Sequence, residues 1–222
     1  MKKIFILAMA AAAMVSCGSA TKYTITGTSE EFEDGKWAFV GEKGRTDSVQ
    51  IVGNSFTLKG AVETPYAAYV TIGEPNTRPE IVVRMFVEPG KIEIKKLNPE
   101  HRSFSAVGTT MNDKQSDFNN KVWELQKNDG SDEEYIALHK SFIEENIDNV
   151  LGLNAFKGSY YYFKPQDVIA LIDAMPAAAQ EELAKTKESA EQALKVLPGN
   201  PYIDVVEKDA NGKEISLKSV VE

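Results

Sequence analysis

The chain has 222 residues, a formal net charge of −8 and a sequence pI of about 5.0. This length allows one or two domains with a substantial hydrophobic core. The acidic balance argues against nucleic-acid binding, because proteins that bind nucleic acid present a basic face to the phosphates. Cys17 is the only cysteine, so the chain has no second thiol for an internal disulfide.

The N-terminus has the pattern of a lipoprotein signal. Lys2 and Lys3 give a positive start, and residues 4–15 are uncharged but too few to cross a bilayer, which takes about 20 apolar residues. The three residues before Cys17 resemble a bacterial lipobox: Met14, Val15 and Ser16. This resemblance implies lipidation of Cys17 and removal of residues 1–16, which changes the net charge from −8 to −10 because both lysines are lost. The alternative is an ordinary secretory signal in which Cys17 has no role.

Residues 17–22 are interpreted as a lipidated tether, and residues 23–108 as a β-rich domain. Short apolar or alternating stretches recur there between Gly, Pro and Asn residues, which is typical of strands and turns. Gly53 and Asn54 form a turn pair of the hairpin type. The spacing predicts an antiparallel β-sandwich or a partly closed barrel.

Residues 109–198 are predicted to be helical, because the hydrophobic spacing changes to that of helices. Ser131 and Glu134 have the spacing of a capping box. Pro165 is expected in the first turn of a later helix, which Pro176 ends. Residues 181–197 are expected to continue as an amphipathic helix.

Residues 199–222 are predicted to form a separate β-hairpin after a Pro- and Gly-containing linker. Asn211 and Gly212 are expected to supply the positive φ angles of a tight turn. A two-stranded hairpin is only marginally stable alone, so we expect it to dock on the rest of the chain or to contact a protein partner. The predicted fold class is α+β: a β-sandwich or partly closed barrel, a helical segment and a C-terminal hairpin.

Three segments together resemble a known arrangement of domains. Residues 86–92 resemble the late-strand motif of a domain of unknown function in lipoproteins of the Bacteroidota, and residues 142–155 resemble the helix motif that follows it. Residues 200–217 resemble the opening hairpin of a TlpA/ResA-like thioredoxin module. In that family a Cys-x-x-Cys follows this hairpin, whereas this sequence ends first. The resemblance therefore implies the non-catalytic front portion of a thiol–disulfide oxidoreductase.

No residue is predicted to be catalytic, and no cofactor or metal is expected. His101 and His139 lie in different predicted elements without the spacing of metal ligands. The acidic residues 132–134 are interpreted as a helix cap. Glu144 and Glu145 are interpreted as a solvated helix face, because adjacent helix residues point in different directions.

Trp37 and the aromatic residues 160–163 have two interpretations. Exposed aromatic rings could stack on sugars, but aromatic residues also dominate cores and domain interfaces, and packing is the favoured interpretation. The segment 41–44 is interpreted as a turn, since a phosphate-binding loop needs a longer glycine pattern.

These observations predict a lipid-anchored accessory module that has no catalytic activity and binds a partner or ligand. It would contact the membrane through its anchor. Residues 18–21 lack an acidic run, which favours the periplasmic face over the cell surface. Two alternatives remain open: a truncated thiol–disulfide oxidoreductase and a surface glycan-binding lipoprotein.

Overall fold

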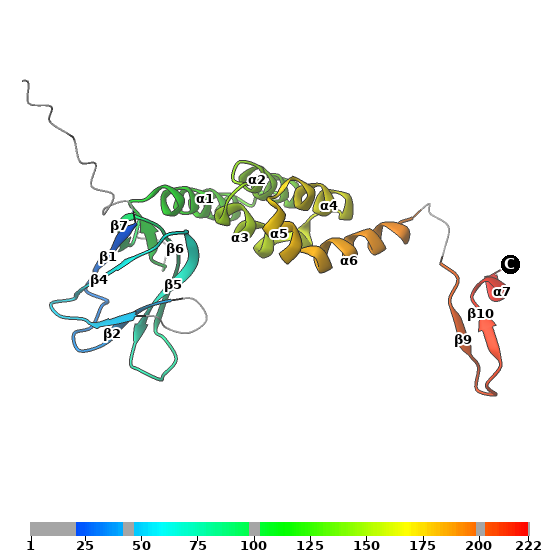
Figure 1. Ribbon diagram of the computed structural model, residues 1–222, viewed down its shortest axis with the longest axis horizontal. Coiled ribbons are helices and arrows are strands. Elements are labelled where there is room, and N and C mark those ends of the chain that lie inside the picture. Colours follow the sequence, from blue (N-terminus) through cyan, green and yellow to red (C-terminus); the bar gives the residue numbers. More distant parts are fainter. Residues whose placement is uncertain (1–20, 42–46, 98–102, 199–202, 222) are drawn as a thin grey trace, which may run out of the picture. The chain divides into compact units, whose positions relative to one another are not determined.

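The computed structural model describes residues 21–41, 47–97, 103–198 and 203–221 (Figure 1). Cys17, His101 and residues 199–201 of the predicted linker 198–201 lie outside these ranges. The chain divides into two compact units, Met1–Ser116 and Asp117–Glu222. Among the described helices, none combines the length and the apolar character that crossing a membrane requires.

The first unit contains two four-stranded sheets. The first sheet consists, in spatial order, of β4 (Ser55–Ala61), β1 (Lys22–Thr28), β7 (Gly90–Lys95) and β8 (Ser105–Val107). The second sheet consists of β3 (Asp47–Gln50), β2 (Trp37–Gly41), β5 (Tyr66–Gly73) and β6 (Ile81–Val87). Buried side chains from both sheets form one hydrophobic cluster, so the sheets pack as a sandwich.

One strand pairing differs from the purely antiparallel prediction. β1 pairs antiparallel with β4 but parallel with β7, so the first sheet is mixed. Ile25 lies opposite Leu58 on one side and Ile92 on the other. All three are buried, and this apolar row across the sheet favours the register. The sheets do not close into a barrel, and the α+β class is confirmed.

The described helices follow the sheets in the chain. They are α1 (Thr110–Lys127), α2 (Asp132–Glu144), α3 (Val150–Ser159), the 3₁₀ turn η1 (Tyr160–Tyr162), α4 (Pro165–Ala174), α5 (Ala177–Glu182) and α6 (Ala184–Lys195). The capping box is confirmed: Ser131 accepts from the Glu134 amide, and the Glu134 side chain accepts from the Ser131 amide. Pro165 begins α4 as predicted.

The helix predicted over residues 181–197 is confirmed over Ala184–Lys195, but its predicted start is wrong. α5 ends at Glu182, and Leu183 has φ −94° and ψ 6° before α6 begins. Leu183 and Ala179 are both buried in the hydrophobic cluster of the second unit, and α6 packs against α4. Ala179 of α5 and Ala190 of α6 both belong to this core, so both segments contribute to it.

The C-terminal hairpin consists of β9 (Val206–Lys208) and β10 (Glu214–Ser216), and α7 (Lys218–Val221) follows. The prediction that Asn211 and Gly212 both have positive φ angles is wrong for Asn211. Gly212 has a positive φ of 79°, but Asn211 does not. The connecting loop spans residues 209–213, because Lys208 pairs with Glu214. Asp209 shapes this loop: its carboxylate accepts from the amides of Asn211 and Lys213.

Candidate ligand-binding site

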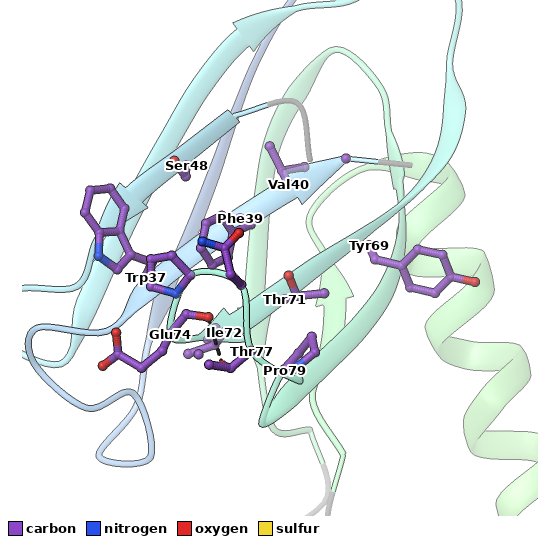
Figure 2. A pocket seen from close by; sticks show the side chains of 14 residues that line it. Trp37, Phe39, Val40, Ser48, Tyr69, Thr71, Ile72, Glu74, Thr77 and Pro79 are labelled. Carbon is purple, nitrogen blue, oxygen red and sulfur yellow. Dashed lines mark hydrogen bonds between the residues drawn. The ribbon is translucent and has the colours of Figure 1, made fainter. Parts of the chain in front are cut away.

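A cavity of about 640 Å³ lies on the outer face of the second sheet (Figure 2). Its floor is formed by β2 and β5, with a contribution from Ser48 of β3, and its wall by the loop between β5 and β6. This volume is within the range of small-molecule sites in proteins, about 300–1,000 Å³. The cavity is therefore large enough to hold a small organic ligand.

Strand alternation places two aromatic rings in the cavity. Ala38 and Val40 of β2 point into the sandwich core and are buried, so Trp37 and Phe39 point outward. Their ring centroids are 6.5 Å apart and their planes differ by 22°. Both residues line the cavity, whereas the partly exposed Tyr69 ring lies at its far end (Figure 2). The two rings of β2 thus form a nearly parallel pair.

The strand pairing determines which residues lie beside these two rings. Phe39 pairs with Ser48 of β3 and with Thr71 of β5, so a hydroxyl-bearing side chain stands on each side of its ring. Trp37 pairs with Gly73 of β5. Because Gly73 has no side chain, nothing from that position covers the indole.

The loop that walls the cavity is held by hydrogen bonds of its own. The amide and hydroxyl of Thr77 both donate to the Glu74 carbonyl, at 3.3 and 2.9 Å. Asn76 has a positive φ of 64°, and Pro75 precedes it, which is the residue pattern of a type II turn. The Glu80 amide donates to the Ile72 carbonyl at 2.9 Å and closes the base of the loop. The wall is thus an ordered turn.

An ion pair connects this loop to the start of β2. The Lys36 ammonium lies 2.5 Å from a carboxylate oxygen of Glu80 and 2.8 Å from one of Glu33. The pKa of Lys36 is raised by its hydrogen bonds to the two carboxylates, with that to Glu33 having the larger effect and that to Glu80 the smaller. Lys36 directly precedes Trp37, so the pair joins the wall of the cavity to its floor.

The aromatic residues 160–163 confirm the packing interpretation only in part, because Tyr160 and Tyr162 contact the rings of Phe156 and Tyr135 but are not buried. Phe163 is buried as expected, but the exposed fractions of Tyr160, Tyr161 and Tyr162 are 37%, 63% and 43%. They form the 3₁₀ turn η1, in which three successive residues point in three directions, so they cannot all face one core. Tyr160 and Tyr161 line a smaller cavity of about 350 Å³.

His139, the histidine that the described part of the chain contains, has the contacts of a structural residue. His139 is largely buried, and its Nδ1 lies 2.9 Å from the Tyr135 carbonyl. Its ring contacts those of Tyr135 and Phe118 at centroid distances of 4.1 and 4.9 Å. Burial lowers the pKa of His139, and the bond to Tyr135 opposes this in part. Among the described residues, no three His, Cys, Asp or Glu side chains are grouped to hold a metal ion.

Residues 86–92 have a structural role that the sequence did not predict. The Glu88 carboxylate is buried and accepts from the amides of Met111 and Asn112, at 2.7 and 3.3 Å. The buried Asn112 side chain accepts from the Phe86 amide at 2.9 Å and donates to the Phe86 carbonyl at 2.8 Å. Glu88 and Asn112 therefore attach the beginning of α1 to the end of β6. We call these two residues the β6–α1 clamp.

Residues 142–155 form a tight corner between α2 and α3. Asn146 is buried, and its side chain donates to the Phe142 carbonyl at 2.8 Å. Asn149 caps α3 by accepting from the amides of Leu151 and Gly152. A Cβ on Gly152 would lie 2.0 Å from the Asn146 carbonyl oxygen. This second motif of the resemblance is therefore also structural.

The sequence named Trp37 as a residue that could stack on a ligand but did not name Phe39 or Thr71. The signal for Phe39 was present, because residues at positions i and i+2 of a strand share a face. Thr71 could not be found in this way, since its place beside Phe39 depends on the pairing of β2 with β5.

Residues 23–115 match the family model described as a domain of unknown function (DUF4369). The matched range includes Trp37, Phe39, Thr71 and the β6–α1 clamp. It supports the resemblance of the β-rich part to a domain of unknown function. No curated protein and no solved structure matches the chain.

Proposed function

We propose that this protein is a lipid-anchored, non-catalytic binding module of the cell envelope, which holds a ligand in the cavity on β2 and β5. One observation carries the proposal: a cavity of about 640 Å³ is lined by two nearly parallel aromatic rings, by hydroxyl-bearing side chains beside them and by an ordered loop. An apolar pocket with a few placed polar groups is the usual form of a small-molecule site.

The two tryptophans allow a direct test of binding at this cavity. Trp37 lines the cavity, whereas Trp123 lies in α1 of the second unit. Protein labelled with 5-fluorotryptophan should give two ¹⁹F signals, which the Trp123→Phe variant assigns. In a screen of a chemically diverse fragment library, we expect saturable shifts of the Trp37 signal while the Trp123 signal stays in place. A screen in which no compound moves the Trp37 signal would contradict the proposal.

The lipid anchor rests on the lipobox-like residues 14–17, which lie outside the described part of the structure. Several acyl chains anchor a protein stably, since each buried methylene contributes about 0.8 kcal/mol. In a bacterial host, the native chain should incorporate labelled fatty acid and sediment with membranes. Cys17→Ser should abolish both, and Ser19→Ala is the matched control that should change neither. A Cys17→Ser protein that remains lipidated would refute the anchor.

The proposal also includes a protein contact at the C-terminal hairpin, on the periplasmic face of the envelope. Its support is the exposure of apolar side chains in the hairpin and in the residues directly before and after it: Ile203, Val205, Val206, Ile215, Leu217 and Val220. By resemblance, the partner system is that of envelope thiol–disulfide oxidoreductases. Because Cys17 is the only cysteine, we propose no thiol chemistry for this chain itself, and turnover of a disulfide substrate by the purified chain would contradict this.

A further inference from the structure

We infer that the ligand of the β2–β5 cavity is a neutral saccharide, whose ring stacks on the platform that Trp37 provides beside Phe39. This inference rests on the proposed function, because it names the ligand class of the same cavity. Aromatic rings have electron-rich faces, and one face of a pyranose ring presents weakly positive C–H groups. The Trp37 ring lines the cavity and has only Gly73 as its cross-strand partner on β5, so it offers a surface for such a face.

The polar groups around the platform suit a ligand with many hydroxyl groups. Ser48 and Thr71 stand on either side of Phe39, and a hydroxyl can both donate and accept a hydrogen bond. Asn76 also lines the cavity, and its amide supplies donors and an acceptor. Sugar hydroxyls need both kinds of partner, so these side chains can satisfy them around the rim of a stacked ring.

The cavity is poorly suited to an extended peptide. Peptides that bind to sheets usually add a strand at a free edge and form main-chain hydrogen bonds there. The floor is formed mainly by β2 and β5, which are the two inner strands in the order β3-β2-β5-β6. Each already pairs on both sides, so recognition at this floor must rely on side chains.

The charge beside Trp37 disfavours anions. Glu74 lines the cavity and directly follows Gly73, the cross-strand partner of Trp37. A carboxylate at this position repels phosphates, sulfates and acidic sugars, and it accepts hydrogen bonds from neutral hydroxyl groups. This feature separates neutral saccharides from nucleotides and uronic acids as ligands.

The test uses the Trp123→Phe protein, in which Trp37 is the only source of tryptophan fluorescence. It is titrated with neutral oligosaccharides of gluco-, manno- and galacto-configuration and of N-acetylglucosamine, and with uronic-acid oligosaccharides, nucleosides and unstructured peptides. We expect a saturable fluorescence change with at least one neutral saccharide and weaker or no binding of the other classes. Tighter binding of an acidic sugar, a nucleoside or a peptide overturns the inference and leaves the proposed function standing.

Sugar affinities of protein variants, measured by calorimetry, show which residues contact the bound sugar. Trp37→Ala should weaken binding by about tenfold or more, as truncation of a central aromatic contact does. Thr71→Val keeps the side-chain shape but removes the hydroxyl, and should weaken binding about three- to tenfold. It serves as the second test if Trp37→Ala does not fold. Tyr161→Ala, which alters the exposed tyrosines of the other unit, should leave affinity unchanged.

The remaining outcomes are also decisive. Sugar binding that is lost in Tyr161→Ala but kept in Trp37→Ala and Thr71→Val would overturn the inference, because the site would then lie on η1. The absence of saturable binding by every neutral saccharide overturns it as well. Whether the cavity binds any ligand at all is then decided by the separate fragment screen, so the two failures are distinguishable.

Discussion

Replacing Gly152 with alanine is expected to destabilise the second unit by about 3 kcal/mol, at the upper end of the usual cost of overpacking. The new methyl group would lie 2.0 Å from the backbone oxygen of Asn146 and 3.2 Å from that of Ile143. Neither carbonyl can move away easily, because the corner between α2 and α3 is fixed by the Asn146 and Asn149 side chains. The beginning of α3 would have to shift.

Gly158 provides the matched control, because it lies in the same helix and a Cβ added there would meet no neighbouring atom within 4 Å. Gly158→Ala should stabilise the unit by about 0.5–1 kcal/mol, since alanine favours helix more than glycine does. Urea unfolding is followed by Trp123 fluorescence in a Trp37→Phe background, because Trp123 lies in this unit. Stability changes of the same sign in the two variants would refute this account of the corner.

The second large effect is expected at the β6–α1 clamp. Asn112→Ala should destabilise the first unit by about 2–4 kcal/mol. It removes three hydrogen bonds, two with the Phe86 backbone and one with Thr109, and leaves buried polar groups without partners. Glu88→Gln keeps an acceptor oxygen but loses the charge that favours a helix N-terminus, so its effect should be smaller.

Asn120→Ala is the control for the clamp, since Asn120 lies on an exposed part of the same helix. It should change stability by less than about 0.5 kcal/mol. Trp37 fluorescence in the Trp123→Phe background follows unfolding of the first unit. Equal stability of the Asn112→Ala and Asn120→Ala proteins would show that the clamp contributes nothing to the first unit.

The sequence predicted best those features that a few neighbouring residues determine. Gly53 and Asn54 have φ angles of 61° and 56°, as their turn pair predicted. The Ser131 cap and the Pro165 start of α4 are also confirmed. Each depends on hydrogen bonds or steric limits within about four residues, so no knowledge of the tertiary fold is needed.

Features that depend on distant segments could not be predicted. The parallel pairing of β1 with β7 is selected by which apolar faces meet in the sandwich. Asn112 has the pattern of an ordinary polar residue of a helix, and only the position of Phe86 shows that it is buried and bonded. The ligand site could be predicted only in part. The alternating pattern of β2 indicates that its two aromatic residues share a face, but the hydroxyl groups beside them depend on strand register.

The position of β1 between β4 and β7 has a consequence for the nascent chain. The Thr26 hydroxyl of β1 donates a hydrogen bond to the carbonyl of Ile92 in β7, which lies 66 residues later in the sequence. Until Ile92 has been synthesised, the inner strand β1 can complete only its pairing with β4. This long-range pairing raises the contact order and slows folding. During biosynthesis, one side of β1 would remain an unpaired strand edge, which is the type of surface that chaperones shield from aggregation.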